Sequence, residues 1–277
     1  NSQLHDWLAN LQQTFEPKPT TTTSKLEDLS RVKTIFPSLD TISEYPVVFM
    51  CQTGSAMYHL NVPSSDEDYR LIFVAPSNKL LSLDGASTGT YGVHKHAPYA
   101  SDKHGVIEYT AIELINYLRA LVKGNPNAIE LLFTPETMSA SWIWQELADM
   151  KHKFLTKSCS KQYIGFIGKH LEKAKKKQEN VKVFSKLMYQ VFHKLFELRR
   201  ILQGEDPHIA LRGEEREFVL SIRAKSLIGN LAPNKLVNRT EDMFDCLKQQ
   251  QQRFRGSELS KKEVEEWCLS VRKRLQE

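Results

Sequence analysis

The sequence has few cysteines and few of the residues that mark non-globular chains. It holds 4 cysteines in 277 residues, at positions 51, 159, 246 and 268. They form no Cys-x-x-Cys pair, so a zinc ribbon is not expected, and reduced thiols in a reducing compartment are favoured over a disulfide framework. The 12 glycines and 11 prolines are too few for a collagen-like chain.

Long hydrophobic runs are also missing. No stretch approaches the roughly 18 consecutive apolar residues of a membrane span, and no charged segment followed by an apolar one opens the chain as a secretory signal would. We therefore expect no membrane association and an intracellular protein, cytoplasmic or nuclear. Because the chain begins at Asn1 rather than at a methionine, organellar targeting by a segment further upstream stays an open alternative.

What is present is an ordinary globular composition with an uneven charge. Apolar residues make up 40% and charged residues 26%, which excludes a wholly disordered chain. The net charge of +5 divides into −7 for residues 1–150 and +12 for residues 151–277. The acidic half suits the binding of cations and the basic half the binding of an anionic partner, although a lysine-rich helical face can also be merely well solvated.

The first half of the chain alternates between helical and strand-like patterns. We expect an amphipathic helix over 3–15, a threonine- and proline-rich linker over 17–24, and a second helix that ends near Pro37. Apolar and β-branched runs predict three strands, and capping and proline signals predict two further helices. The strands are expected over 46–53, 68–75 and 104–109, with a polar loop over 76–102, and the helices over 111–123, begun by Thr110 and Glu113, and over 126–133, begun by Pro126.

From about residue 139 the sequence has helical periodicity almost throughout. The expected helices cover 141–155, 160–178, 182–203, 214–229, 240–255 and 260–276. The whole pattern predicts the α+β class, with a small mixed sheet flanked by helices and followed by an α-helical domain.

The stretch from Thr53 to Val74 holds residues suited to chemistry on phosphates. Gly54 and Ser55 follow a predicted strand, where free backbone N–H groups and a hydroxyl can meet a phosphate. Asp66 and Asp68 enter the next strand at i and i+2, so their side chains are expected on one face. Two carboxylates on one face repel each other unless a cation lies between them, and Mg²⁺ is the cation that such oxygen ligands suit.

A third carboxylate would complete a two-metal site. Glu108 is the best candidate, because it lies on the predicted 104–109 strand, which a neighbouring position in the sheet would bring beside Asp66 and Asp68. Two ions about 4 Å apart could then activate an attacking hydroxyl and neutralise a triphosphate leaving group.

These motifs resemble those of a known family. Gly54-Ser55 followed by Ser65-Asp66-Glu67-Asp68 is similar to the nucleotidyltransferase superfamily of DNA polymerase β. The Lys123-Gly-Asn-Pro-Asn127 turn, followed by Glu130-Leu-Leu-Phe133, resembles more narrowly the RlaP-type, RNA-ligase-associated predicted nucleotidyltransferases. The likeness covers about residues 47–228.

The resemblance implies a palm-like nucleotidyltransferase domain and a Mg²⁺-dependent reaction, with Mn²⁺ as an alternative. Asp66, Asp68 and Glu108 would be the metal ligands and catalytic residues. The nucleotide-binding residues would be Gly54, Ser55, Ser65 and Arg70. We accordingly expect N-terminal helices and a linker over 1–37, the nucleotidyltransferase domain over 38–156 and the basic helical domain over 157–277.

The sequence departs from the family pattern in three places. His59 stands where relatives tend to have a glycine after the Gly-Ser pair, and Glu108 stands where aspartate is common. Around Gln190 and His193 the family tends toward histidine and arginine. None of these changes removes the metal ligands, so an active enzyme is expected.

Four further residues are candidate substrate contacts. Lys123 and Asn125 could touch nucleotide or acceptor, although Asn125 capping a helix and Gly124 ending the previous one is the favoured interpretation. Lys173 and Lys176 lie on a basic helix face that could meet RNA phosphates. Glu130 is expected to be a structural partner rather than a catalytic group.

The function that we predict is transfer of a nucleoside monophosphate from an NTP to an acceptor hydroxyl, with an RNA 3′ end as the leading acceptor and pyrophosphate as product. A protein or small-molecule acceptor is the first alternative. A nucleotide- or RNA-binding module with a decayed site is the second.

Overall fold

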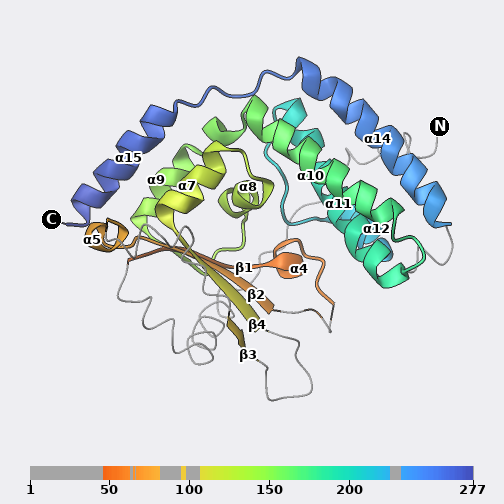
Figure 1. The fold of residues 1–277 in the computed structure, drawn as a ribbon, viewed down its shortest axis with the longest axis horizontal. Helices are drawn as coiled ribbons and strands as arrows, with labels where there is room; N and C mark the ends of the chain where they lie inside the picture. The colour runs from red at the N-terminus through yellow and green to blue at the C-terminus, as the bar shows by residue number, and fades with distance from the viewer. Residues whose placement is uncertain are drawn as a thin grey trace.

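The computed structural model describes residues 46–62, 65, 67–81, 95–97, 107–224 and 232–276. The helices expected over 3–15 and 24–37, and the linker between them, lie outside these residues. Within the described residues the chain forms a mixed sheet with helices packed over one face and a helical region beside it (Figure 1). The predicted α+β class is confirmed.

The sheet has five strands in the order β3-β4-β2-β1-β5. They are β1 (Val47–Thr53), β2 (Glu67–Phe73), β3 (Lys95–Ala97), β4 (Ile107–Glu113) and β5 (Ser139–Ala140). β1 runs antiparallel to β2 and β5, β3 runs antiparallel to β4, and β2 and β4 are parallel. The sequence predicted β1, β2 and, with different ends, β4, but not β3 and β5, which are too short to show a periodic pattern.

The middle of β1 is buried on both faces, which explains its continuous apolar run. Val48, Phe49 and Cys51 are fully buried. Phe49 stacks on Trp144 of α9 (Trp142–Asp149), with ring centroids 3.8 Å apart. In Figure 1, α9 lies above this sheet together with α7 (Leu114–Val122) and α8 (Pro126–Phe133).

The boundary between β4 and α7 differs from the prediction. Thr110 and Glu113 were expected to open a helix at 111, but β4 continues to Glu113 and α7 begins at Leu114. The reason is pairing, because Thr110–Ile112 lies in register with Arg70–Ile72 of β2. The cap is formed by Glu113 instead, whose side chain accepts a hydrogen bond of 2.6 Å from the Ile115 backbone N–H.

The turn from α7 to α8 has the structural role that was favoured for it. Gly124 has φ +75°, and a Cβ at this position would lie 2.3 Å from the Cα of Cys159. Asn125 caps α8, because its side-chain oxygen accepts from the backbone N–H groups of Asn127 and Ala128. The Lys-Gly-Asn-Pro turn therefore packs directly against the start of α10 (Lys157–Lys175).

The helical region follows the predicted order with shifted ends. The segment 141–155 divides into α9 and a 3-10 turn over Lys151–Phe154. α14 begins at Pro233, earlier than expected, because a proline is well suited to the first turn of a helix. The remaining helices are α5 (Ser77–Leu80), inside the expected loop, α11 (Val181–Gln203), α12 (Gly213–Arg223), α14 (Pro233–Arg253) and α15 (Lys261–Arg274).

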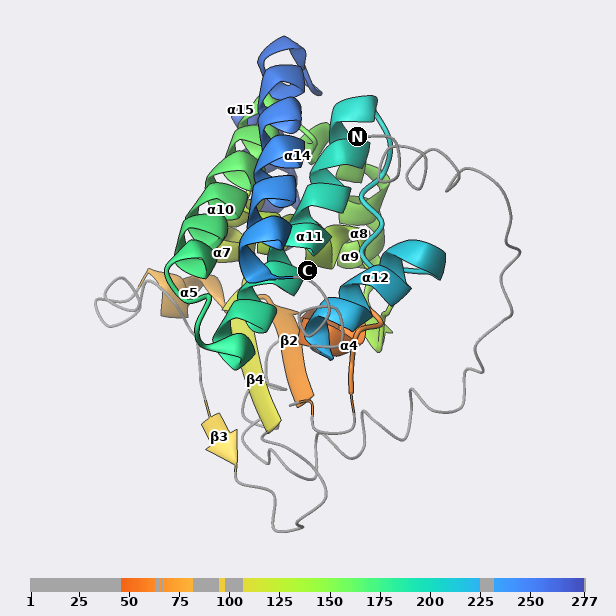
Figure 2. The ribbon, with the colours of Figure 1, turned by 90° about the vertical axis from the view of Figure 1, so that its right-hand side faces the viewer.

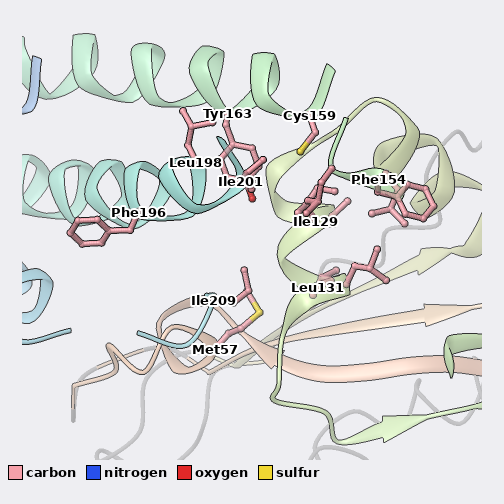
Figure 3. Close-up of a cluster of buried hydrophobic side chains, with 14 of the residues drawn as sticks. Met57, Ile129, Leu131, Phe154, Cys159, Tyr163, Phe196, Leu198, Ile201 and Ile209 are labelled. Atoms are coloured by element: carbon pink, nitrogen blue, oxygen red, sulfur yellow. The ribbon is translucent and has the colours of Figure 1, made fainter. Parts of the chain in front are cut away.

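One buried apolar cluster joins the sheet side and the helical side. It extends from Val48 on β1 to Val271 on α15. In the close-up of Figure 3, Met57 of the short helix α4 (Gly54–Met57) lies beside Ile209, beneath the side chains of α10 and α11. The turn that follows β1 is therefore anchored in the helical region. None of the described helices has the length and apolar character to cross a membrane.

The last two helices form an outer layer. Figures 1 and 2 show α14 lying along α10 and α11, and α15 continuing to the side of α7 and α9. Arg272 of α15 donates hydrogen bonds to the Ala75 carbonyl and to the buried Glu113 carboxylate. This ion pair ties the last helix to the end of β4.

Candidate active site

The Gly-Ser turn and Asp68 are brought together by the pairing of β1 and β2. Thr53, the last residue of β1, lies in register with Asp68. Gly54 follows with φ +64°, and a Cβ there would lie 2.4 Å from Oδ2 of Asp68. Only glycine permits both the left-handed backbone and this close approach. The result is a carboxylate directly against the backbone of a turn suited to phosphates.

The parallel pairing of β2 with β4 places a second acidic residue beside Asp68. Glu108 lies in register with Asp68, and Thr110 with Arg70. The side chain of Glu108 lies outside the described part of the structure, as does the whole of Asp66. Of the three predicted metal ligands, the structure therefore brings together the backbone of Glu108 and the complete residue Asp68.

A cavity of about 480 Å³ opens at this point of the sheet. Asp68 and Arg70, at i and i+2 on β2, line it together with the Gly54 turn. Asn116 of α7 and the capping residue Asn125 contribute polar groups to its wall. A negative and a positive side chain thus enter one cavity from neighbouring positions of one strand face.

The two predicted serines are held in different ways. Ser55 is buried, and its carbonyl accepts a 2.8 Å hydrogen bond from the Leu60 backbone N–H. The Ser65 hydroxyl oxygen accepts 2.8 Å hydrogen bonds from the Val62 backbone N–H and from Nη2 of Arg223. Ser65 therefore links the segment before β2 to the end of α12.

His59, the departure from the family pattern, has a left-handed backbone with φ +58°. This conformation favours glycine over a residue that carries a Cβ. The strain is held by contacts on both sides. The imidazole Nε2 lies 3.1 Å from Oε1 of Glu136, and the His59 carbonyl accepts a 2.8 Å hydrogen bond from Nε of Arg216.

The three lysines that were predicted as substrate contacts do not line the cavity. Lys123 ends α7 with an exposed side chain, and its carbonyl accepts from the Ser158 hydroxyl. Lys173 and Lys176 are exposed at the carboxyl end of α10. Asn125 is the one of the four candidate contacts that the structure places at the cavity.

A buried polar network begins in the wall of the cavity, which Tyr58 and Glu130 help to line. Tyr58, directly after α4, donates a 3.0 Å hydrogen bond to Oε2 of Glu130. Lys194 of α11 donates to Oε1 of Glu130 and, at 3.3 Å, to Oε1 of Glu197. Tyr163 of α10 donates a 2.6 Å hydrogen bond to the other oxygen of Glu197. These contacts connect the turn after β1 with α8, α10 and α11, and Glu130 also lines the cavity.

His193 of α11 joins this network through both ring nitrogens. Nε2 of His193 lies 2.8 Å from the Ile209 carbonyl oxygen. Nδ1 lies 2.5 Å from a carboxylate oxygen of Glu197. Burial opposes the charge of Glu197, but Lys194 and His193 outweigh it and lower the pKa of that carboxyl.

The same network contains a group that could hold a metal ion. One ligand atom from each of Glu130, His193 and Glu197 lies within 4.8 Å of the others. The Lys194 ammonium, however, already donates to both carboxylates and supplies the neutralising charge. A nitrogen-containing set of this kind also suits transition metals better than Mg²⁺, whereas Asp68 at the open cavity offers oxygen alone.

Sequence reasoning missed His193, Lys194, Glu197 and Tyr58. The available signal was the segment from Val191 to Leu198, which is buried at every position although it carries charges of both signs. A carboxylate three and four positions after two basic residues, inside an apolar run, indicates a buried ion pair rather than a solvated face.

Three comparisons place these features among known proteins. Residues 22–259 match the RlaP family, described as the RNA repair pathway DNA polymerase beta family. The chain is 27% identical over 128 residues to an uncharacterized 38.9 kDa protein in the nrdC-mobD intergenic region of Enterobacteria phage T4. That alignment covers 43% of this chain and 36%, about a third, of the phage protein.

Among solved structures, the chain is similar to a nucleotidyltransferase-like protein from Exiguobacterium sibiricum 255-15. The sequence identity is 10% and the TM-score is 0.32, over 80% of this chain and 75% of that one.

Proposed function

Because the chain belongs to the RNA repair pathway DNA polymerase beta family, we propose that it is a Mg²⁺-dependent nucleotidyltransferase. Family membership makes it a protein of the nucleotidyltransferase kind. The finer proposal is that it moves a nucleoside monophosphate from an NTP to an acceptor hydroxyl, most favourably an RNA 3′ end, and releases pyrophosphate. In this proposal the domain over 38–156 holds the reacting groups and the domain over 157–277 closes one side of the cleft.

The observation that carries the proposal is the carboxylate of Asp68 against the backbone of Gly54. A cavity of about 480 Å³ opens beside them. A turn with positive φ exposes backbone N–H groups to a phosphate, and an adjacent carboxylate would repel that phosphate without a cation between them. The pair therefore supports a site for a metal–phosphate complex rather than for a free anion.

The described ligands fit Mg²⁺, which takes oxygen donors and shares its shell with substrate phosphates. Asp66, Asp68 and Glu108 would hold it, and the register of Asp68 with Glu108 supports two of the three. When bound, the metal would neutralise charge on the triphosphate and acidify the attacking hydroxyl.

The residues of the chain would orient the reactants for in-line attack on the α-phosphorus. The N–H groups of Gly54 and Ser55 would hold phosphate oxygens. Arg70, which lines the cavity, would offset the charge of the acidic residues around it. One of the carboxylates would accept the proton of the acceptor hydroxyl or pass it to water.

An RNA acceptor is favoured by the charge of residues 151–277, which is +12. The exposed Lys173 and Lys176 on α10 belong to this basic half. Phosphate contacts from lysine supply sequence-independent affinity for nucleic acid. The family description, an RNA repair pathway, points to the same class of acceptor.

The test is a transfer assay with NTPs labelled at the α-phosphate, Mg²⁺ and total RNA. We expect label on RNA with the wild-type chain, and a loss of about a thousandfold or more with Asp68→Asn, because a metal ligand would be removed. Glu67→Gln is the matched control. It makes the same change of charge one position earlier on β2, where Glu67 accepts from the Tyr69 hydroxyl rather than facing Gly54.

The outcomes separate the alternatives. Label on protein would support a protein acceptor, and label on a small molecule would support a metabolite acceptor. NTP binding without any transfer would support a binding module with a decayed site. Equal transfer by Asp68→Asn and the wild type would contradict the proposed chemistry.

A further inference from the structure

Arg223 reaches the candidate site from the helical region. It is the last residue of α12, and its Nη2 donates a 2.8 Å hydrogen bond to the hydroxyl of Ser65, three positions before Asp68 in the chain. The Ser185 hydroxyl of α11 donates to the carbonyls of Ile222 and Arg223, which fixes the backbone at the end of α12. The guanidinium is thus placed by two helices next to a predicted nucleotide-binding residue.

The guanidinium of Arg223 has an unused donor. Among the residues that the structure describes, the buried Nη1 has no hydrogen-bond partner, and no ion pair joins Arg223 to an acidic residue. Neighbouring arginines differ in this respect. Arg199 and Arg200 both pair with Glu215, at 2.8 and 2.7 Å. A buried donor nitrogen without a partner carries a desolvation cost, which a bound anion would offset.

The charges of Arg223 and Asp68 both affect the pKa of the same residue, Tyr189. The guanidinium of Arg223 lies over the ring of Tyr189, 5.0 Å from its centroid. Burial raises the pKa of the Tyr189 phenol, Arg223 opposes this rise, and Asp68 adds to it. Tyr189 therefore lies within the electrostatic reach of both charges.

We infer that Arg223 is a phosphate-binding residue for the triphosphate of the nucleotide. Its Nη1 would donate to a phosphate oxygen while Nη2 keeps Ser65 in place. Guanidinium groups suit this task because they are always charged and present their donors in a planar fork. The inference rests on the proposed function, and it adds that the helical region senses whether the bound nucleotide carries its phosphates.

The test measures binding by calorimetry in the presence of Mg²⁺, with ATP, adenosine and inorganic tripolyphosphate as probes. We expect Arg223→Gln to weaken the binding of ATP and of tripolyphosphate by roughly 10- to 100-fold, because a hydrogen bond from a charged group would be lost. Adenosine binding should change less than twofold. Arg239→Gln, an exposed position on α14 with the same change of charge, should leave all three unchanged.

A merely structural role for Arg223 predicts a different pattern. If Arg223 only braces Ser65, Arg223→Gln would lower the melting temperature and weaken ATP and adenosine alike. Arg223→Lys distinguishes the phosphate-binding role from the structural role further, because the retained positive charge should recover part of the tripolyphosphate affinity. Loss of adenosine binding equal to that of ATP, or unchanged tripolyphosphate affinity, would overturn the inference.

Failure of the inference and failure of the proposed function remain distinguishable. RNA labelling with an unchanged KM for NTP in Arg223→Gln would retain nucleotidyl transfer and reject the phosphate contact. Arg223-dependent binding of tripolyphosphate without any transfer would retain the contact and reject the activity.

Discussion

At the scale of single residues, the atom that leaves no room for a Cβ at Gly54 belongs to a side chain and not to the backbone. The hypothetical Cβ of Gly54 would meet the carboxylate of Asp68, and the φ of +64° adds strain for any other residue. We expect Gly54→Ala to destabilise the fold by about 1–3 kcal/mol, measured by urea unfolding. In an Asp68→Ala background, the loss of unfolding free energy caused by Gly54→Ala should fall to about 1 kcal/mol, the contribution of the backbone conformation alone.

The control for this cycle is Gly165→Ala on α10, where a Cβ would meet nothing within 4 Å. That change should stabilise by about 0.5–1 kcal/mol, since alanine is the better helix former. Additive effects of Gly54→Ala and Asp68→Ala would show that the two residues do not touch in solution.

At the scale of elements, the buried network holds α8, α10 and α11 to the turn after β1. Lys194→Met would remove the ammonium that donates to the carboxylates of both Glu130 and Glu197. We expect the unfolding free energy to fall by about 3–5 kcal/mol, because a buried charge loses its partner. The exposed Lys186→Met on the same helix should change it by less than about 0.5 kcal/mol.

The same network gives a check on the origin of the loss. Lys194→Met combined with Glu130→Gln and Glu197→Gln removes the carboxylate charges but keeps acceptors for the Tyr58 and Tyr163 hydroxyls. Most of the lost free energy should return in this triple variant. If the triple variant is no more stable than Lys194→Met alone, packing of the lysine stem rather than charge would explain the loss.

The network also predicts how stability depends on pH. The folded pKa of Glu197 lies below its ordinary value of 4.5, through Lys194 and His193, although burial opposes the shift. A depressed carboxyl pKa stabilises the fold fully above the unfolded pKa and progressively less as the pH falls through the folded one. Urea unfolding between about pH 3 and 7 should therefore show a smaller acid-side loss for Glu197→Gln than for the wild type. Parallel curves would contradict this assignment.

Elements were predictable where local signals and pairing agree. The apolar run of β1, the proline and asparagine that begin α8, and the stripe of α11 each indicate the element that forms. The capping signal at Thr110 failed because pairing of β4 with β2 extends the strand to Glu113, and pairing is not a local property. The proximity of Gly54 to Asp68 follows from the antiparallel pairing of β1 with β2, and it could have been predicted from the sequence.

The contacts between distant helices were not predictable in the same way. Arg223 meets Ser65 across 158 positions of the chain, and Lys194 meets Glu130 across 64. A single sequence carries the identity of such residues but not the packing angles that bring them together. The charged residues within the apolar run of α11 were the only local trace of the network among the residues that the structure describes.

At the scale of the whole molecule, the charge asymmetry is the feature open to measurement. Binding of a single-stranded RNA 3′ end should weaken linearly on a plot of log affinity against log salt. Each phosphate contact that is lost should reduce the slope by about 0.7. We therefore expect Lys173→Gln/Lys176→Gln to lower the slope by about 1.4, with filter binding as the measurement.

Lys261→Gln/Lys262→Gln is the matched control. These lysines are exposed on α15 and pair with Glu265 and Glu266 one turn later. An equal reduction of the slope in both double variants would assign RNA affinity to net charge rather than to the end of α10.

The contact of Gly124 with α10 has a consequence for how the sequence can change. The atoms that would obstruct a Cβ at Gly124 are the backbone Cα and N of Cys159, at 2.3 and 2.6 Å. Backbone atoms are common to all twenty residue types, so no exchange of the Cys159 side chain can make room. At Gly54, shortening Asp68 can relieve the clash. A substitution of Gly54 can therefore be compensated by a second substitution at Asp68. A substitution of Gly124 cannot be compensated by a substitution at Cys159.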